Sequence, residues 1–484
     1  MEMHPHRSAE RSTYAKIARR ILATAIVGLA LQNGPQAHAQ AETSAIHPET
    51  CHTVMFHFPH SSHLPDQGYI SEAQIADEEV SVAEAAEAFS AGLDPSLDFS
   101  SLHSTAIGLA EVCTSEDLAE LTEKGASDVE NIKMYQPTDL DVTSVVQGDE
   151  DYPDADVMRI MNPNEAWSRG ATGADAGLAV VLIDTGVDTT HPALANSIST
   201  TQKCFSRAPE GFTSMCPNGK EEDDSAFNAD PAAYHGTMMA GYIASVSHGE
   251  IIPIQATSEE ATADGNKVVL RGDNLVRAYD YVIASNGRIA AVNASYGQGE
   301  YTSSRACLDD NKLEAELIQL ITRKGIAFVT ATGNEFGLNF TISPACLPIN
   351  GLIAVGSSTD TDTVADHSDM AEWVKVLAPG EALVSTYPNN QFAIGTGTSG
   401  STALVSGAVQ VERDIYRNGT PQFMEDNLIQ TGVRIADQRI GSDGHTNGVV
   451  ASRVDFMGIV NKWIADYIRA NPISRLILPF ALNK

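Results

Sequence analysis

The chain has 484 residues, of which 43% are hydrophobic, enough for a large core and a second folded unit. Its acidic side chains outnumber its basic ones by 63 to 30, which gives a formal net charge of −33. This negative charge argues against nucleic acid and anionic membrane surfaces as partners. Its ordinary effect is to keep the protein soluble.

Residues 1–39 have the three parts of an export signal. Basic residues begin the segment: Arg7, Arg11, Lys16, Arg19 and Arg20. The apolar run Ile21–Leu31 is too short to span a bilayer, and Ala37-His38-Ala39 is typical of a cleavage site. We therefore expect a signal peptide cut after Ala39 and a secreted or periplasmic protein with no membrane span in its mature form. A short membrane anchor is the alternative, which the Ala-x-Ala ending disfavours.

Residues 40–137 alternate strand and helix patterns, which predicts a small α+β domain. The order is strand, helix, strand, helix and strand, at about 51–58, 81–93, 104–112, 114–124 and 129–135. Residues 138–156 follow as an acidic linker with little pattern. We expect this linker to be exposed and easily cleaved, so that the mature N-terminus lies within it.

From residue 157 to residue 462 apolar strand patterns alternate with amphipathic helix patterns. This predicts an α/β domain with a doubly wound, mostly parallel sheet and helices on both faces. The expected strands are 178–184, 250–256, 289–295, 325–331, 352–357 and 374–378, and the expected helices are 236–247, 273–285 and 310–324. Residues 196–234 are interpreted as a surface insertion. Residues 463–484 form a C-terminal tail whose function the sequence does not indicate.

A continuous apolar run ends at Asp184, which Thr185-Gly186 follows. Such a run predicts a buried parallel strand with Asp184 at its C-terminal tip, where open α/β sheets carry their ligands and catalytic groups. Taken alone, this aspartate could equally cap a turn. Asp188, four residues later, is interpreted as a turn residue.

His235 stands at the start of a small-residue helix pattern, in Tyr234-His235-Gly236-Thr237. The competing histidine is His191, which precedes a proline. Because only His235 begins a Gly-Thr helix, His191 is interpreted as structural.

Ser399 lies at a loop-to-helix turn, inside the small-residue stretch Ile394–Gly407. At such a turn the backbone N–H points outward and the positive helix end favours a developing anion. This suits a nucleophilic serine with an oxyanion site beside it, although an ordinary serine N-cap is the alternative. An Asp, a His and a Ser can form a chain in which the carboxylate orients the imidazole and the imidazole deprotonates the serine.

These three stretches resemble the D-T-G, H-G-T-x-x-A-G and G-T-S motifs of the subtilisin-like serine proteases, the subtilases (peptidase S8), in that family's order. Asn293–Gly297 is similar to the family's substrate-binding strand, Ala331–Asn334 to its oxyanion block, and Ala378–Gly380 to a further marker. The resemblance covers roughly residues 157–460. It implies a subtilisin-like fold and a serine endopeptidase that hydrolyses peptide bonds through an acyl-enzyme.

The resemblance also implies the roles of the site residues. Asp184, His235 and Ser399 would be the catalytic triad, with Ser399 preferred to Thr398 and Ser401 because it occupies the family's serine position. Asn334 would donate its amide to the oxyanion, the alternative being a turn asparagine. Ser295, Tyr296 and Gly297 would bind an extended substrate through backbone groups, as in strand addition to a sheet edge. We also expect Tyr296 to narrow the pocket for the residue before the scissile bond.

Residues 40–137 resemble the pro-segment of the family, which assists folding and inhibits temporarily. The implied protein is therefore an autoprocessed zymogen, whose partners are peptide or protein substrates and its own pro-segment. The chemistry requires no cofactor and no metal. Structural calcium is possible, but the sequence does not show it, because the acidic run Glu221–Asp224 is more typical of a solvated face than of a ligand set.

Six cysteines in an exported chain indicate disulfides, although six allow 15 pairings. Proximity in the sequence suggests Cys204 with Cys216 and Cys307 with Cys346, which leaves Cys51 and Cys113 inside the pro-segment.

Two other hypotheses compete with the serine protease. A catalytically silent subtilase fold that serves as a binding or scaffold protein is disfavoured, because all four chemical residues are retained. A serine-carboxyl peptidase would use Glu and Asp in place of His, and the intact motif around His235 disfavours it.

Overall fold

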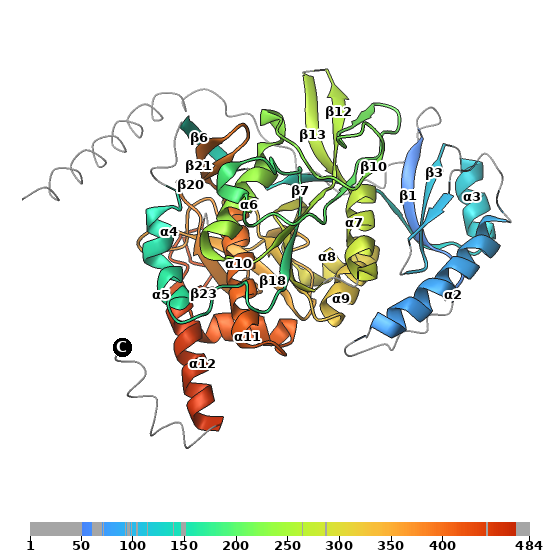
Figure 1. Cartoon of the computed structure of the whole chain (residues 1–484). Coiled ribbons are helices and arrows are strands. Elements are labelled where there is room, and N and C mark those ends of the chain that lie inside the picture. Colours follow the sequence, from blue (N-terminus) through green and yellow to red (C-terminus); the bar gives the residue numbers. More distant parts are fainter. Residues whose placement is uncertain are drawn as a thin grey trace, which may run out of the picture. The chain divides into compact units, whose positions relative to one another are not determined.

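The structure is a computed structural model (Figure 1). It describes residues 51–60, 70, 72–91, 93, 97, 99–102, 105–113, 115–138, 140–146, 152–263, 265–285, 288–441 and 444–470. The expected signal peptide, its cleavage site after Ala39 and residues 471–484 of the tail lie outside these ranges. No helix within the ranges is long and apolar enough to cross a bilayer.

Residues 51–131 lie in the segment that we expect to be a pro-segment, which is called the pro-segment below. They form an antiparallel sheet in the order β2-β3-β1-β4 with two helices (Figure 1). Its elements are β1 (His52–His57), α2 (Glu72–Ser90), β2 (Phe99–Ser101), β3 (Ile107–Val112), α3 (Ser115–Glu123) and β4 (Ser127–Asn131). The rings of Phe56, Phe58, Phe89 and Phe99 meet between sheet and helix, with centroids 5.4–6.1 Å apart. The helix expected at 81–93 begins earlier, at Glu72, and β2 adds a strand that the sequence did not indicate.

The region expected to be the catalytic domain, called the catalytic part below, is built on a ten-stranded sheet in the order β10-β8-β11-β7-β14-β16-β18-β19-β23-β22. The pairs from β8 to β23 are parallel, and only the edge pairs β10–β8 and β22–β23 are antiparallel. The strands are β7 (Ala179–Asp184), β8 (Lys203–Phe205), β10 (Glu222–Asp223), β11 (Ile251–Gln255), β14 (Ile289–Ala294), β16 (Ala327–Ala331), β18 (Leu352–Ser358), β19 (Val376–Pro379), β22 (Val433–Ala436) and β23 (Val450–Arg453). All six strands expected from the sequence are present.

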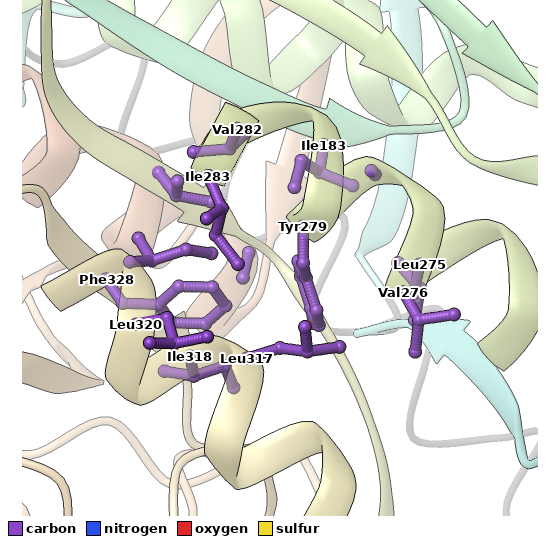
Figure 2. Close-up of a cluster of buried hydrophobic side chains, with 14 of the residues drawn as sticks. Ile183, Leu275, Val276, Tyr279, Val282, Ile283, Leu317, Ile318, Leu320 and Phe328 are labelled. Carbon is purple, nitrogen blue, oxygen red and sulfur yellow. The ribbon is translucent and has the colours of Figure 1, made fainter. Parts of the chain in front are cut away.

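Helices cover both faces of this sheet, because its central strands are apolar on both sides. In β7, Val181 and Ile183 pack against α7 and α9, and Figure 2 shows Ile183 in this cluster with side chains of both helices. Val180 and Leu182 point the other way, into a second cluster that includes residues of α6 and α10. The helices are α6 (Tyr234–Val246), α7 (Gly272–Ala284), α9 (Lys312–Arg323), α10 (Thr398–Ile415), α11 (Pro421–Thr431) and α12 (Phe456–Ala470). The predicted fold class, a doubly wound α/β sheet, is confirmed.

Two smaller sheets lie beside the main one. A six-stranded sheet has the order β17-β15-β5-β13-β12-β9, and a three-stranded sheet has the order β20-β21-β6. Their strands are β5 (Met134–Pro137), β6 (Asp141–Val146), β9 (Phe212–Ser214), β12 (Thr257–Thr262), β13 (Gly265–Arg271), β15 (Tyr296–Tyr301), β17 (Thr341–Ser343), β20 (Leu383–Tyr387) and β21 (Gln391–Thr396). Short helices complete the chain: α4 (Ala155–Ile160), α5 (Pro163–Trp167), α8 (Ser304–Asp310), η1 (Pro192–Leu194) and η2 (Pro231–Ala233).

The described residues of the segment 138–156 are more ordered than those of an unpatterned linker. Its residues Asp141–Val146 form β6, which pairs antiparallel with β21. Asp154 caps α4 by accepting from the backbone N–H groups of Asp156 and Val157, at 2.9 and 3.1 Å. The pattern of β6 is weak alone, and its partner strand, far along the chain, stabilises it. At the other end α12 runs through residue 470, so the boundary that we placed between 462 and 463 falls inside a helix.

Three disulfides join all six cysteines. They are Cys204–Cys216, Cys307–Cys346 and Cys51–Cys113. The pairs suggested by proximity in the sequence are confirmed, and the remaining pair links the start of β1 to the end of β3, where the antiparallel pairing brings the two residues together.

Candidate active site

Asp184 and His235 form a buried hydrogen-bonded pair. Asp184 ends β7 at the carboxyl edge of the main sheet, and His235 lies in the first turn of α6. The His235 Nδ1 atom is 2.8 Å from Asp184 Oδ1 and 3.0 Å from Oδ2. A carboxylate can only accept, so Nδ1–H is the donor, and Nε2 is left as the basic nitrogen of a neutral ring.

The glycine after His235 lets α6 approach the strand tip closely. A Cβ atom on Gly236 would lie 2.1 Å from the carbonyl oxygen of Gly186. The hydroxyl of Thr185 accepts from Gly236 N–H at 2.9 Å and donates to the Ala233 carbonyl at 2.7 Å. The Asp-Thr-Gly and His-Gly-Thr stretches therefore pack closely against each other. Their packing and the Thr185 hydrogen bonds hold the imidazole of His235 beside the carboxylate of Asp184.

Ser399 lies near the start of α10, and its hydroxyl does not cap the helix. The cap residue is Gly397, which makes no side-chain cap bond. The Ser399 hydroxyl instead donates to the Thr138 carbonyl at 2.7 Å and lies 3.4 Å from the Ser295 carbonyl oxygen. The His235 Nε2 atom has no hydrogen-bond partner among the described residues. The structure thus pairs Asp184 with His235, whereas the Ser399 hydroxyl is bonded to Thr138, the first residue after the expected pro-segment, and not to His235.

Asn334 lies in the loop after β16, and Thr398 orients it. The Asn334 Oδ1 atom accepts from the Thr398 backbone N–H at 2.8 Å and from the Thr398 hydroxyl at 2.9 Å. The preceding residue, Gly333, has φ +109°, a conformation that side chains disfavour. The backbone conformation at position 333 therefore requires a glycine.

Asp369 holds the loop that carries Asn334 through backbone hydrogen bonds. Its Oδ1 atom accepts from the backbone N–H groups of Glu335 and Gly337, at 3.0 and 2.6 Å, and its own N–H donates to the Gly333 carbonyl at 3.0 Å. Burial raises the pKa of Asp369 to about 7, although these backbone bonds act in the opposite direction. No motif marks Asp369, so sequence reasoning missed it.

The strand β5 lies between two strands of the catalytic part. On one side Gln136 and Pro137 pair antiparallel with Gly297 and Tyr296 of β15. On the other side Tyr135 pairs with Leu270 of β13. The Thr138 N–H then donates to the Ser295 carbonyl at 3.0 Å. Residues 134–138 are therefore held as an extended peptide whose last carbonyl reaches Ser399.

Tyr296 has a position different from the one that we expected. We predicted that its side chain narrows the pocket for the residue before the scissile bond. Its ring instead lies edge-on to Tyr135, with centroids 6.1 Å apart, and its hydroxyl is 2.9 Å from that of Tyr279. Side chains alternate along an extended strand. The ring of Tyr296 therefore contacts Tyr135, which lies three residues before Thr138.

A cavity of about 270 Å³ lies beside Thr138 and Asn334. Ile342, Glu300 and Glu335 also line it. The cavity is next to the end of the extended peptide, where the side chain at position 138 would bind.

The competing polar residues have structural contacts. His191 accepts from the Ala193 N–H at 3.2 Å, and its other ring nitrogen is 2.9 Å from the Gln391 carbonyl oxygen. Asp188 accepts from the N–H groups of Thr190 and Asn389, at 3.1 and 2.8 Å. In the part of the chain that the structure describes, no three His, Cys, Asp or Glu side chains are grouped so that they could hold a metal ion.

Comparisons with known proteins place this geometry in context. Residues 175–451 match the model of the subtilase family. The major intracellular serine protease of Bacillus subtilis (strain 168) is 30% identical over 260 residues, which cover 52% of this chain and 72% of that protein. Subtilisin BL of Lederbergia lenta is 25% identical over 303 residues, which cover 61% of this chain and 97% of that protein.

Other matches cover less of the partner or are more distant. The extracellular serine proteinase of Thermus sp. (strain Rt41A) is 24% identical over 265 residues, 53% of this chain and 56% of that protein. The crystal structure of a cold adapted subtilisin-like serine proteinase matches 59% of this chain and 90% of that chain, with 21% identity and a TM-score of 0.42. The region that the family model matches contains Asp184, His235, Asn334 and Ser399 and begins after the pro-segment.

Proposed function

Since the chain belongs to the subtilase family and resembles serine proteases, it is a serine endopeptidase, and we propose that Asp184, His235 and Ser399 carry out its chemistry. The observation that carries the proposal is the 2.7 Å hydrogen bond between the Ser399 hydroxyl and the carbonyl of Thr138, the last residue of an extended peptide. This contact places the Ser399 oxygen next to the carbonyl group that it would attack, and in the proposed reaction the hydroxyl turns its proton from this oxygen to His235.

In the proposed reaction the Ser399 Oγ atom attacks the carbonyl carbon of the substrate. His235 Nε2 takes the hydroxyl proton, and Asp184 holds the ring and stabilises its charged form. The carbonyl oxygen becomes an anion, which the Asn334 amide and the backbone N–H of Ser399 stabilise. The imidazolium then gives its proton to the leaving amine.

The acyl-enzyme formed in this step is an ester between Ser399 and the substrate. A water molecule, deprotonated by His235, attacks the ester and releases the new carboxyl end. These steps require no metal and no cofactor.

We further propose that the first substrate is the chain itself, cut between Thr138 and Asp139. Thr138 is the residue whose carbonyl meets Ser399, and β5 occupies the strand position that a substrate peptide would take. Until it leaves, the pro-segment excludes other substrates, because His235 and Ser399 are only 3% and 0% exposed. The protein is therefore proposed to be a zymogen that processes itself.

We propose that the protein works outside the cytoplasm. The sequence of residues 1–39 predicts a signal peptide, three disulfides suit an oxidising compartment, and some relatives are named extracellular proteases. Its substrates would be peptides or proteins.

The test is the mass of the purified full-length protein over time, with no other protease present. The wild type should release a fragment that ends at Thr138. Ser399→Ala should fold and stay intact, and His235→Ala should do the same, because without a base the serine is a poor nucleophile.

The matched control is Ser401→Ala, two residues along the same helix. The Ser401 hydroxyl donates to the carbonyls of Ala378 and Pro379, each at 3.0 Å, so its loss weakens the fold slightly and leaves processing intact. If Ser399→Ala loses its pro-segment as fast as the wild type and still reacts with a fluorophosphonate, the nucleophile is wrong. A folded, processed wild type that does not react would favour the binding or scaffold protein.

A further inference from the structure

The loop that carries Asn334 has a backbone shape that its own residues do not favour. Gly333 has φ +109°, and Phe336 has φ +61°, in the left-handed region that residues with a side chain rarely adopt. The Phe336 side chain is 66% exposed, so its packing contributes little to holding the loop. Contacts from outside the loop must therefore keep its shape.

The backbone of the segment 367–370 makes two of these contacts. The Phe336 N–H donates to the His367 carbonyl at 3.1 Å, and the Met370 N–H donates to the Gly337 carbonyl at 2.9 Å. Both bonds lie at the end of the loop farther along the chain from Asn334. The backbone next to Asn334 is held by another residue.

Asp369 holds the backbone on both sides of Asn334. Its N–H donates to the carbonyl of Gly333, the residue before Asn334, at 3.0 Å. Its Oδ1 atom accepts from the N–H of Glu335, the residue after Asn334, at 3.0 Å, and from the N–H of Gly337 at 2.6 Å. The side chain that makes these bonds is completely buried.

The carboxylate of Asp369 lies directly against the loop. A Cβ atom at Gly333 would lie 2.2 Å from Oδ2, and one at Gly337 would lie 2.8 Å from Oδ1. Oδ2 is buried and has no hydrogen-bond partner among the described residues. A buried carboxylate with one unpartnered oxygen lowers the stability of the fold. Stability alone therefore does not account for an aspartate at position 369.

We propose that Asp369 is a positioning residue for the reaction: by holding the backbone on both sides of Asn334, it keeps the Asn334 amide directed at the oxyanion. This inference rests on the proposed function, in which Asn334 is the oxyanion donor. Thr398 holds only the amide oxygen of Asn334, so the backbone of the loop needs a second hold. A donor stabilises the oxyanion only within hydrogen-bond distance, and a misplacement of about 1 Å can cost about 100-fold in rate.

The experiment uses the self-processed enzyme and the internally quenched peptide Lys-Met-Tyr-Gln-Pro-Thr-Asp-Leu. Asp369→Ala should lower kcat by about 10- to 100-fold and change KM by less than about twofold, because the misplaced donor matters mainly in the transition state. In Asp369→Asn the amide oxygen can accept the same two N–H bonds. This variant should therefore keep kcat within about fivefold of the wild type, even if it is less stable.

The double variant Asn334→Ala, Asp369→Ala tests whether Asp369 acts through Asn334. Without the Asn334 amide there is no donor for Asp369 to position. The kcat of the double variant should therefore lie within about threefold of that of Asn334→Ala alone. If the two losses multiply instead, Asp369 acts in some other way and the inference is overturned.

The matched control is Asp414→Ala, at the other end of α10 from Ser399. Asp414 is a buried aspartate that also accepts from backbone N–H groups of a loop, those of Gly173 and Ala176, each at 2.5 Å. Its loss should lower the thermal stability and leave kcat within about twofold of the wild type. A loss of kcat as large as that of Asp369→Ala would show that destabilisation alone explains both variants, which would overturn the inference.

The remaining outcomes separate the inference from the proposed function. If Asn334→Ala keeps the wild-type kcat, the proposed oxyanion donor is wrong and the inference fails with it. If Asn334→Ala is slow and Asp369→Ala is not, only the inference fails. If Asp369→Ala does not fold, Asp369→Ser takes its place. Its shorter side chain cannot reach both N–H groups, so kcat should fall at least about fivefold, and a wild-type kcat would overturn the inference.

Discussion

At the scale of single residues, the orientation of Asn334 depends on the neighbour of the proposed nucleophile. The backbone N–H and the hydroxyl of Thr398 both donate to the amide oxygen of Asn334. The amide nitrogen is therefore turned away from Thr398. The same helix start thus carries Ser399 and sets the direction of the proposed oxyanion donor.

Asn334→Ala should lower kcat by about 10²- to 10³-fold, the loss that follows removal of one such donor in subtilisin itself. KM should change little, because the donor bonds the oxyanion more strongly than the ground-state carbonyl. The measurement is kcat and KM on a quenched peptide, with the exposed Asn350→Ala as control. A raised KM with an unchanged kcat would assign Asn334 to substrate binding instead.

The sequence locates some site residues and not others for a physical reason. Asp184, His235 and Ser399 each lie at an end of a strand or helix, where neighbouring small residues leave a local pattern. Thr138 and Asp369 reach the site only through tertiary contacts, and their sequence neighbours are unremarkable. Asp369 is a clear case, because an acidic residue in a loop is normally taken to face solvent.

At the scale of elements, one predicted strand proves to be two with different partners. The pattern at 129–135 predicted a single final strand of the pro-segment. The chain forms β4, which pairs with β1 inside the pro-segment, and β5, which pairs with β13 and β15 of the catalytic part. Only residues 132 and 133 separate them. A strand whose partners lie more than a hundred residues away leaves no periodic signal of its own.

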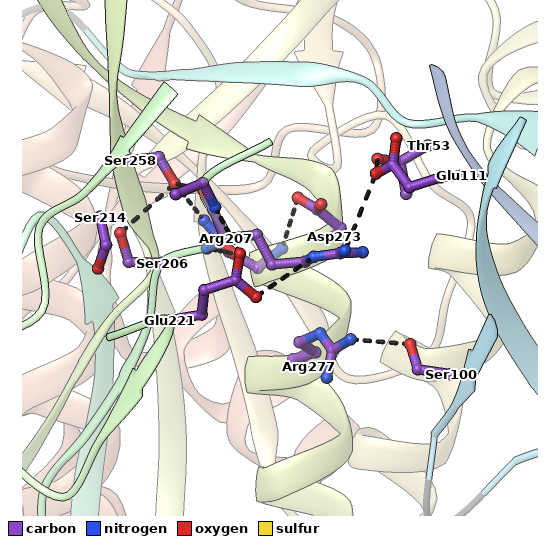
Figure 3. A network of polar contacts seen from close by, with 12 residues as sticks. Thr53, Ser100, Glu111, Ser206, Arg207, Ser214, Glu221, Ser258, Asp273 and Arg277 are labelled. Atoms are coloured by element: carbon purple, nitrogen blue, oxygen red, sulfur yellow. Dashed lines mark hydrogen bonds and ion pairs between the residues drawn. The ribbon is translucent and has the colours of Figure 1, made fainter. Parts of the chain in front are cut away.

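Polar side chains join the pro-segment to the catalytic part on both sides of β5. Figure 3 shows Arg277, whose guanidinium donates to the Ser100 hydroxyl at 2.8 Å. In the same network Arg207 lies 3.9 Å from Glu111. Glu130 of β4 accepts from the first two N–H groups of α9, those of Lys312 and Leu313, at 3.1 and 3.4 Å. A carboxylate at the N-terminus of a helix interacts favourably with the helix dipole.

Another polar contact between the pro-segment and the catalytic part depends on pH. His57 of β1 lies 2.7 Å from Glu316 of α9 and 3.4 Å from Asp128 of β4. The hydrogen bond to Glu316 raises the pKa of His57 above 6.5, with burial acting against it and Asp128 adding to the rise. The charged histidine therefore stabilises the bound pro-segment below about pH 6.5, and this contribution is lost as the pH rises through the raised pKa.

We expect the cleaved pro-segment to leave faster at higher pH. Because the pair is partly exposed, this contact should contribute only a two- to fivefold difference in release rate, roughly 0.5–1 kcal/mol. The measurement is the onset of peptide hydrolysis after the processed complex is moved from pH 5.5 to pH 8. His57→Gln should flatten this pH dependence, and so should Glu316→Gln. An unchanged slope in both variants would mean that other groups control release.

At the scale of the whole molecule, the disulfides divide the chain at the proposed cut. Cys51–Cys113 lies entirely before Thr138, whereas Cys204–Cys216 and Cys307–Cys346 lie entirely after it. No covalent link among the described residues joins the two sides except the backbone. The strands divide in the same way, since β5 precedes the cut and β6, paired with β21, follows it.

Processed wild-type protein should therefore behave as one particle when native and as two chains when denatured. In the native state the strand pairs on both sides of β5 and the polar contacts around it hold the pieces together, so they should elute together from a sizing column. After denaturation without reductant they should separate into a pro-segment that ends at Thr138 and a catalytic chain, each at the mass found with reductant. The uncut Ser399→Ala protein is the control and should stay a single chain under both conditions. If the two wild-type pieces separate only after reduction, a disulfide crosses the cut, and either the cysteine pairing or the position of the scissile bond is wrong.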